Sequence, residues 1–221
     1  AADYINNSGA DACLFQHEYG IFGGHSGLLA LQLLQNIDLP VISTFHTVLR
    51  QPGFHQKEVL KKIAVYSSHV VVMSRLAVDF LTSVFEVPAG KISIIEHGIP
   101  DFQNANMDNR SIPDKWKNRR IMLTFGLLGR NKGIETVIRA LPAIVEKHPD
   151  MLYVVLGKTH PHVVQHAGEE YRNSLHELVN ELKLENHVEF IDRYVTENEL
   201  IAFLRRADVY VTPYLNEAQI T

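Results

Sequence analysis

The sequence lacks several features that would assign it to a class of protein at once. Its 221 residues include a single cysteine, Cys13, so no disulfide can form within the chain, which is typical of a reducing compartment. No segment has the uninterrupted apolar length of a membrane span, and the first residues do not form a signal peptide. The formal net charge of −4 gives no general attraction for nucleic acid. We therefore expect a cytoplasmic protein that binds no nucleic acid, and we leave peripheral contact with a membrane open.

What the sequence does contain is a regular alternation of short apolar runs with segments of helical periodicity. We expect strands at residues 12–16, 40–46, 69–74, 91–96, 121–125, 151–156, 188–191 and 209–212. We expect helices near residues 24–36, 55–66, 75–85, 133–147, 169–184 and 197–206. Strands that alternate with helices predict an α/β fold with parallel sheets, each covered on both faces.

A polar stretch without periodicity, residues 102–114, divides this alternation into two halves. We predict two Rossmann-like α/β units, residues 1–103 and 115–221, joined by a linker at residues 104–114. The alternation starts and stops abruptly, so we expect both units to be incomplete. Within the second unit, Pro142 should kink or break its helix, and Thr196 with Glu199 should form a capping box at the start of the last helix.

The segment Gly126–Gly133, Gly-Leu-Leu-Gly-Arg-Asn-Lys-Gly, has the pattern of a phosphate-binding loop. It follows a predicted strand and precedes a predicted helix. Glycines allow the backbone to approach a ligand closely, and the free N–H groups at the start of a helix favour an anion. Lys132, at the mouth of the helix, adds a positive charge. The order of strand, turn, lysine and helix therefore predicts that a phosphate binds here.

Ligands of open parallel sheets bind beyond the carboxyl ends of the strands. Besides the phosphate loop, the residues that follow predicted strands are the turn Gly23–Gly24, His46, Ser74, His97, Gly98, Lys158 and Glu217. These residues are the candidates for a binding site.

In this order and spacing, the motifs resemble those of the family 4 retaining glycosyltransferases, and the resemblance covers nearly the whole chain. The family pattern Gly-Arg-x-x-x-x-Lys-Gly is met from Gly126 to Gly133, except that Leu127 occupies the arginine position. In the family, the arginine and the lysine grip the donor diphosphate. The resemblance implies this role for Lys132, with Arg130 as a substitute for the missing arginine. Glu217 matches the first glutamate of the family's Glu-x7-Glu motif, which contacts the donor sugar.

The first half of the chain carries further elements of the resemblance. The segment Thr44-Phe-His46-Thr is similar to the one whose histidine hydrogen-bonds the donor sugar. Val70-Val-Val-Met-Ser74 is similar to a Val-x-Val-x-Ser step, and Ile94–Asp101 to Ile-Pro-Asn-Gly-Val-Asp, with His97 at the asparagine position before Gly98. These matches imply donor binding by Ser74, His97 and Gly98.

The resemblance implies the GT-B fold and a reaction in which a sugar moves, with retention, from a UDP- or GDP-sugar to a glycan or a lipid-linked acceptor. It implies no cofactor and no protein-bound metal. Lys132 would stabilise the departing diphosphate, while Glu217 and His46 would orient the sugar. We therefore treat these three residues as the catalytic set. The oligomeric state is not indicated.

Structural roles compete with each of these assignments. Lys132 could be a solvated lysine at a helix start, His46 could satisfy backbone groups at a strand end, and Glu217 could be a surface carboxylate. Arg130 fits a solvent-facing or structural role. His17 and Glu18 are weaker candidates for contact with the acceptor. The run of His160, His162 and His166 could suggest a metal, but its proline and the lack of cysteine ligands favour an ordinary polar loop.

Two other functions stay open at this point. The first is a nucleotide-sugar-binding fragment that does not catalyse transfer. The second is a dinucleotide-dependent oxidoreductase. Against the second, the loop lacks the Gly-x-Gly-x-x-Gly spacing, and Gly157-Lys158 stands where an acidic ribose ligand would be expected.

Overall fold

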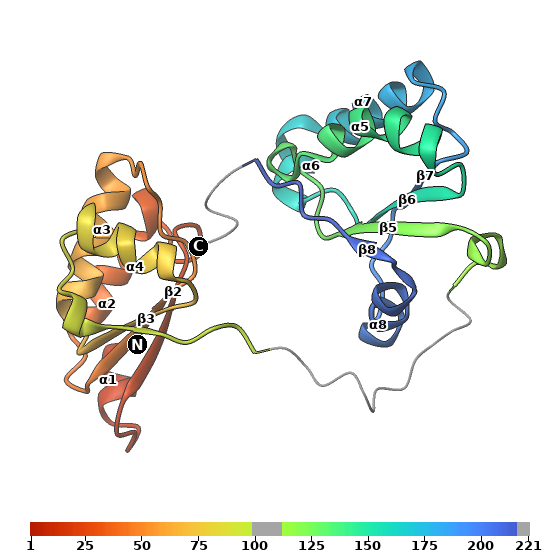
Figure 1. Ribbon diagram of the computed structural model, residues 1–221. Helices are drawn as coiled ribbons and strands as arrows, with labels where there is room; N and C mark the ends of the chain where they lie inside the picture. The colour runs from red at the N-terminus through yellow and green to blue at the C-terminus, as the bar shows by residue number, and fades with distance from the viewer. Residues whose placement is uncertain (99–111, 216–221) are drawn as a thin grey trace. The chain divides into compact units, whose positions relative to one another are not determined.

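The computed structural model describes residues 1–98 and 112–215, and all statements on structure below concern these residues. They form two compact units, a first one within residues 1–98 and a second one within residues 112–215 (Figure 1). Most of the predicted linker and Glu217 lie outside the described residues. The domain limits 1–103, 104–114 and 115–221 therefore remain our proposal.

The first unit contains four parallel strands in the order β1-β2-β3-β4. The strands are β1 (Cys13–His17), β2 (Val41–Phe45), β3 (His69–Val72) and β4 (Ile92–Ile94). The helices are α1 (Ala2–Asn6), α2 (Leu29–Leu34), α3 (Phe54–Tyr66) and α4 (Arg75–Ser83), with 3-10 turns η1 (His25–Gly27) and η2 (Ala89–Lys91). The predicted strands and their parallel pairing are thus confirmed.

The helices α2, α3 and α4 pack on one face of this sheet and form a single core with it (Figure 1). Phe15, Phe45 and Val72 point into this core. On the opposite face, Leu14 is 71% exposed and Ile42 is half-buried. The expectation of helices on both faces is therefore not met by the described part of the first unit. The α1 helix buries no residue.

The second unit also contains four parallel strands, in the order β7-β6-β5-β8. The strands are β5 (Arg120–Phe125), β6 (Met151–Leu156), β7 (Val188–Ile191) and β8 (Val209–Tyr210). The helices are α5 (Ile134–Lys147), α6 (Pro161–Ala167), α7 (Glu170–Glu181) and α8 (Glu197–Arg206), with 3-10 turns η5 (Asp114–Trp116) and η6 (Arg130–Lys132).

This second sheet is covered on both faces, as predicted. On one face, Met122, Tyr153 and Val155 pack against α5 and α7. On the other, Leu123 and Val154 join a second core that includes side chains of η5 and α8. All six residues of β6 are buried, which explains why its sequence is an unbroken apolar run rather than an alternation.

Some local predictions need correction. The helix predicted at 24–36 is divided into η1 and α2, because Ser26 has a left-handed φ of 56°. The α5 helix runs through Pro142 without a break, so that part of the prediction is wrong. The proline ring lies on the exposed side of α5, and the opposite side buries Ile134, Ile138 and Leu141. Burial of that apolar face offsets the lost backbone hydrogen bond.

The capping box predicted at the start of α8 is confirmed. Thr196 accepts a hydrogen bond from the Glu199 N–H at 3.3 Å, and Glu199 accepts one from the Thr196 N–H at 2.8 Å. This reciprocal pair satisfies two backbone donors that a helix start would otherwise leave unpaired.

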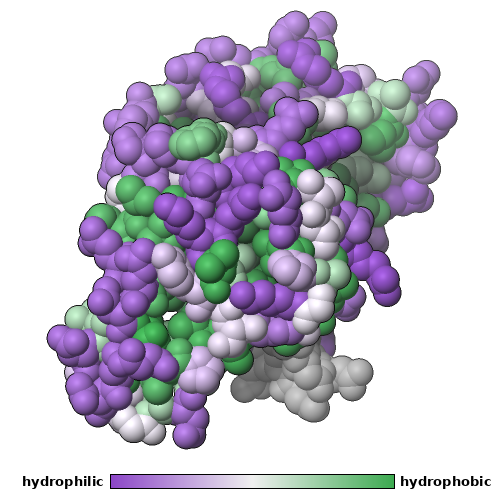
Figure 2. Space-filling view, turned by 90° about the vertical axis from the view of Figure 1, so that its left-hand side faces the viewer, coloured by the Kyte–Doolittle hydropathy of each residue, from purple (hydrophilic) through white to green (hydrophobic). Residues whose placement is uncertain are grey.

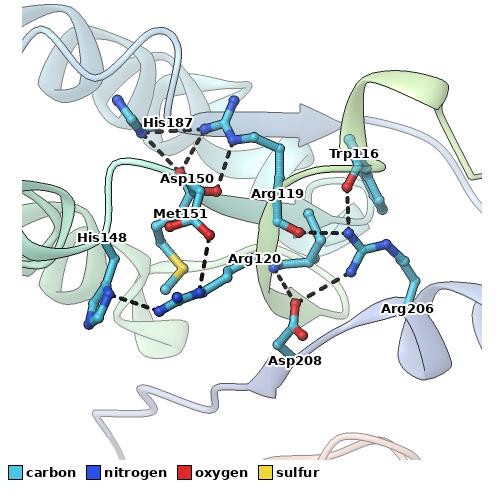
Figure 3. Close-up of polar contacts among 10 residues, drawn as sticks. Trp116, Arg119, Arg120, His148, Asp150, Met151, His187, Arg206 and Asp208 are labelled. Carbon is cyan, nitrogen blue, oxygen red and sulfur yellow. Dashed lines mark hydrogen bonds and ion pairs between the residues drawn. The ribbon is translucent and has the colours of Figure 1, made fainter.

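Arginines hold the amino-terminal edge of the second sheet together (Figure 3). Arg119 donates to the carbonyl oxygens of Asp150, Met151 and Asn186 at 2.9, 2.7 and 2.8 Å. Arg206 donates to the Arg119 carbonyl oxygen at 2.6 Å. These charge-assisted bonds connect the start of β5 to the starts of β6 and β7 and to the end of α8.

The surface on the side of α2, α3 and α4 is mostly hydrophilic, with apolar patches between the polar residues (Figure 2). Ile21, Leu29 and Phe54 are 64%, 52% and 76% exposed in this unit. Among the described residues, no helix has the length and apolar character that crossing a membrane would require.

Candidate functional site

The predicted phosphate loop has the predicted local structure. Strand β5 ends at Phe125, and Gly126 follows with a left-handed φ of 133°. The turn η6 leads to Gly133, which has φ 61°, and α5 begins at Ile134. A Cβ on Gly133 would lie 2.2 Å from the Pro213 carbonyl oxygen, so only glycine fits there. The start of α5 is thus held against the segment that follows β8.

Lys132 lies at the mouth of this loop. Its Nζ is 4.0 Å from the centroid of the Tyr214 ring, within cation–π distance. The same Nζ is 3.9 Å from the point that a Cβ on Gly126 would occupy. The ammonium group is therefore next to the glycine backbone at the end of β5, where the sequence placed a phosphate ligand.

Arg130 contacts side chains of α7. Its guanidinium pairs with the Glu170 carboxylate at 2.6 Å, and both side chains are 66% exposed. It also lies 5.6 Å from the centroid of the Tyr171 ring. Arg130 therefore binds side chains of α7, which is consistent with the structural role that the sequence left open for it.

A cavity of about 170 Å³ opens beside the loop, at the carboxyl ends of β5 and β6. Its lining includes Gly126 and Leu127 from the loop, Lys158 from the end of β6, and Arg193 and Tyr194 from the segment after β7. The sequence had identified the strand end at Lys158, but the contribution of residues 193–195 depends on the packing of α8 and was missed.

The structure also places the candidates of the first unit. His46 donates its backbone N–H to the His17 carbonyl oxygen at 3.1 Å, and its ring Nε2 is 2.8 Å from Gln16 Oε1. The ring centroids of His46 and His97 are 6.2 Å apart, so two predicted donor ligands are neighbours at the carboxyl edge of this sheet. Around Gly98, the space for a side chain is open.

Ser74 has a structural function at the start of α4. Its Oγ accepts a hydrogen bond from the Ala77 N–H at 3.1 Å, which makes it the N-cap of this helix. A donor-binding role for Ser74 would have to share this hydroxyl. Glu217, the remaining catalytic candidate, lies outside the described residues.

Sequence reasoning missed the burial of His17. The side chain is 0% exposed, and neither ring nitrogen has a hydrogen-bond partner among the described residues. Desolvation lowers the pKa of His17 to about 4, against the opposing effect of Glu18 and with a further lowering by His46. A signal was present, because His17 shares the inward-facing alternation of Phe15 on β1. The Glu18 carboxylate accepts bonds from Thr47 Oγ1 at 2.6 Å and from the Tyr19 N–H.

The histidine run has a different structure from the one expected. Pro161 is the first residue of α6, so the prediction of a polar loop is wrong. Proline is favoured at the first position of a helix, where its missing N–H is not needed. In the described ranges, no group of three or more histidine, cysteine, aspartate or glutamate side chains is arranged to hold a metal ion.

The chain has two α/β units with parallel sheets, and the second unit carries a glycine loop with a lysine between strand and helix. This architecture is that of the GT-B fold class. Residues 107–219 match the family described as glycosyl transferases group 1, and the chain belongs to that family.

The chain is also similar to individual known proteins. An uncharacterized glycosyltransferase of Methanocaldococcus jannaschii is 28% identical over 167 residues, which are 72% of this chain and 40% of that protein. Sucrose-phosphate synthase from Thermosynechococcus elongatus is 22% identical, with a TM-score of 0.70 over 96% of this chain and 52% of its own. Anabaena HepE in complex with UDP is 16% identical, with a TM-score of 0.65 over 91% and 53%. The chain thus spans about half the length of these relatives, or less.

Proposed function

We propose that the protein is a retaining glycosyltransferase of the hexosyltransferase type. It would transfer a sugar from a nucleotide-diphosphate-sugar to an acceptor hydroxyl in glycan or polysaccharide synthesis. The observation that carries this proposal is the position of Lys132, whose ammonium group lies against the Gly126 backbone at the end of β5. Membership of the glycosyl transferases group 1 supports the reaction class.

The chemistry requires stabilisation of a leaving group. The bond between the anomeric carbon and the diphosphate oxygen breaks, and its electron pair stays on the diphosphate. The acceptor oxygen forms the new bond, and its proton passes to the departing phosphate. Lys132 and the first N–H groups of α5 are suited to hold the developing negative charge. The resemblance supports a role at the donor sugar for His46 and Glu217. It also supports a role in donor binding for Gly126, Gly133, Ser74, His97 and Gly98.

A UDP- or GDP-sugar is our proposed donor. UDP in the Anabaena HepE structure supports a nucleotide of this kind. A glycan or a lipid-linked glycan is our proposed acceptor, and we retain the cytoplasm as the proposed location.

The test is a calorimetric titration of the chain with UDP and with GDP. Lys132→Ala should weaken binding of the preferred nucleotide about tenfold to a hundredfold, because a hydrogen bond to a charged group contributes about 1.5–3 kcal/mol. Lys147→Ala, at the far end of α5, is the matched control and should bind like the wild type. Equal binding by both variants would remove Lys132 from the site.

Transfer and donor class are tested separately. UDP-glucose or GDP-mannose should raise the melting temperature of the chain, whereas NAD should not, because only a ligand of the folded state stabilises it. Stabilisation by NAD alone would favour the oxidoreductase. Binding of a nucleotide-sugar without transfer of radiolabelled sugar above a no-enzyme control would favour a binding function for this chain.

A further inference from the structure

The phosphate loop is short of one positive charge for the ligand proposed above. Leu127 stands where the resemblance predicts an arginine, and Arg130 is paired with Glu170 on α7. Lys132 is then a single cation for two phosphate groups. If the proposed function holds, on which this inference rests, a second cation should lie beside the same loop.

Lys158 is in the right place. It is the second residue after β6, is exposed, and lines the same cavity as Gly126 and Leu127. Its Nζ is 5.9 Å from the Tyr194 ring centroid on another wall of that cavity. Within residues 112–215 no carboxylate forms an ion pair with it, so its charge is not neutralised by a described side chain.

The backbone keeps Lys158 beside the loop. The Leu128 N–H donates to the Lys158 carbonyl oxygen at 2.8 Å, which extends the β5–β6 pairing past the ends of both strands. A Cβ on Gly157 would lie 2.2 Å from the Gly126 carbonyl oxygen, so the two segments can approach this closely because residue 157 is glycine.

Arg172 fixes the residues on both sides of Lys158. It is 5% exposed and donates from Nη2 to the Gly157 carbonyl oxygen at 2.8 Å and from Nε to Thr159 Oγ1 at 3.3 Å. The Asp192 carboxylate pairs with the same guanidinium at 3.0 Å. The buried Arg172 guanidinium thus connects α7 to the residues on both sides of Lys158.

Arg193 is the other cation in the cavity lining, but it is already paired. Its Nη2 lies 2.7 Å from Glu199 Oε1, and the hydrogen bond from Arg193 is the largest cause that lowers the pKa of Glu199 to about 2. A guanidinium neutralised by this carboxylate is a poorer phosphate ligand than Lys158.

We propose that Lys158 is the second cation of the diphosphate site, in place of the arginine that Leu127 replaces, and that Arg172 is the residue that positions it. The ligand class is the diphosphate of a nucleotide-sugar. Lys158 contacts phosphate, whereas the base and the sugar are bound by other groups.

The experiment compares UDP, GDP and uridine in calorimetric titrations of the full chain. Lys158→Gln should weaken binding of the preferred nucleoside diphosphate about tenfold, the lower limit for a bond to a charged group in an exposed site. Uridine affinity should not change. Lys147→Gln is the matched control, because it removes an equal charge from the same unit. Leu127→Arg in the Lys158→Gln background should restore binding to within about threefold of the wild type.

Several results would overturn the proposal. One is equal nucleoside diphosphate affinity for Lys158→Gln and Lys147→Gln. Another is a failure of Leu127→Arg to restore any affinity in a double variant with a native circular dichroism spectrum. If the wild type binds neither UDP nor GDP, the proposed function fails and this inference falls with it. If the wild type binds and Lys158→Gln makes no difference, only this inference fails.

The role of Arg172 is tested by its coupling to Lys158. In an Arg172→Met background, Lys158→Gln should weaken nucleotide binding less than about threefold, because the lysine is no longer held at the site. A tenfold effect in that background would refute positioning by Arg172. Arg172→Lys serves the same comparison if Arg172→Met does not fold.

Discussion

A fully buried neutral histidine makes the stability of the first unit sensitive to pH. His17 contacts the Tyr19 and Phe45 rings edge-on, with centroids 5.1 and 5.6 Å away, and no described group accepts or donates a hydrogen bond at its ring. Its pKa is lowered to about 4 from 6.5, mainly by desolvation. In the unfolded chain the ring takes up a proton as the pH falls through about 6.5, whereas in the folded chain it stays neutral until about pH 4.

The magnitude follows from these two pKa values. Between about pH 6.5 and pH 4 the unfolded state binds more protons, so the free energy of unfolding falls as the pH is lowered. From about pH 7.5 to pH 5 the loss from His17 alone is about 2 kcal/mol. Variant His17→Phe should lose this part of the pH dependence, whatever its stability at neutral pH, because its ring cannot be protonated.

The assay is amide hydrogen exchange in β1, β2 and β3 under increasing urea, at about pH 7.5 and pH 5. It reports on the first unit, whereas the fluorescence of the single tryptophan, Trp116, reports on the second. His55→Phe, an exposed histidine of the same unit, is the control and should keep the wild-type pH dependence. A His17 ring that titrates above about pH 6 by NMR, or a pH dependence that survives in His17→Phe, would refute the reasoning.

Three further substitutions test the second unit by urea unfolding followed at the tryptophan. Gly133→Ala should lower the free energy of unfolding of this unit by about 2–4 kcal/mol, because the new Cβ meets the Pro213 carbonyl oxygen and the residue has a left-handed φ. A decrease below about 0.5 kcal/mol would contradict this geometry. Thr196→Ala should cost about 1 kcal/mol, whereas Thr196→Ser should be nearly neutral because it keeps the capping box with Glu199. Arg119→Met should cost about 2 kcal/mol through the loss of three charge-assisted bonds to backbone carbonyls, and unchanged stability would show that water replaces these bonds.

The fold could be predicted from the sequence where local signals agreed with the packing. The apolar run Met151–Leu156 indicated a buried parallel strand, and the structure pairs this strand with its neighbours and buries it on both faces. The loop Gly126–Gly133 was recognised because its glycines are needed for backbone geometry, which a sequence displays directly. Thr196 with Glu199 was recognised for the same reason, since a capping box depends on residues three positions apart.

The rest depends on contacts between residues far apart in the sequence. Arg172 looks like an ordinary helix arginine, and its burial follows only from the meeting of α7 with the ends of β6 and β7. Arg130 was predicted as a substitute for the arginine missing at Leu127, and its pairing with Glu170, forty positions later, could not be read from the sequence. Lys158, the cation that we propose for this loop, is brought beside it by the bridge between Leu128 and Thr159.

The charged side chains at the two edges of the second sheet have different roles: those at one edge stabilise the fold, and those at the other edge lie at the proposed ligand-binding site. At the amino-terminal edge, Arg119 and Arg206 bind backbone carbonyls (Figure 3), so their charges are used inside the fold. At the carboxyl-terminal edge, Lys132 lies next to the Gly126 backbone, and Lys158 lines the cavity that Gly126 and Leu127 also line. Substitutions at the first edge should therefore lower the free energy of unfolding and leave nucleotide affinity unchanged in the folded fraction. Substitution of the exposed Lys158 should do the reverse, because an exposed lysine contributes little to folding, whereas its charge attracts a phosphate.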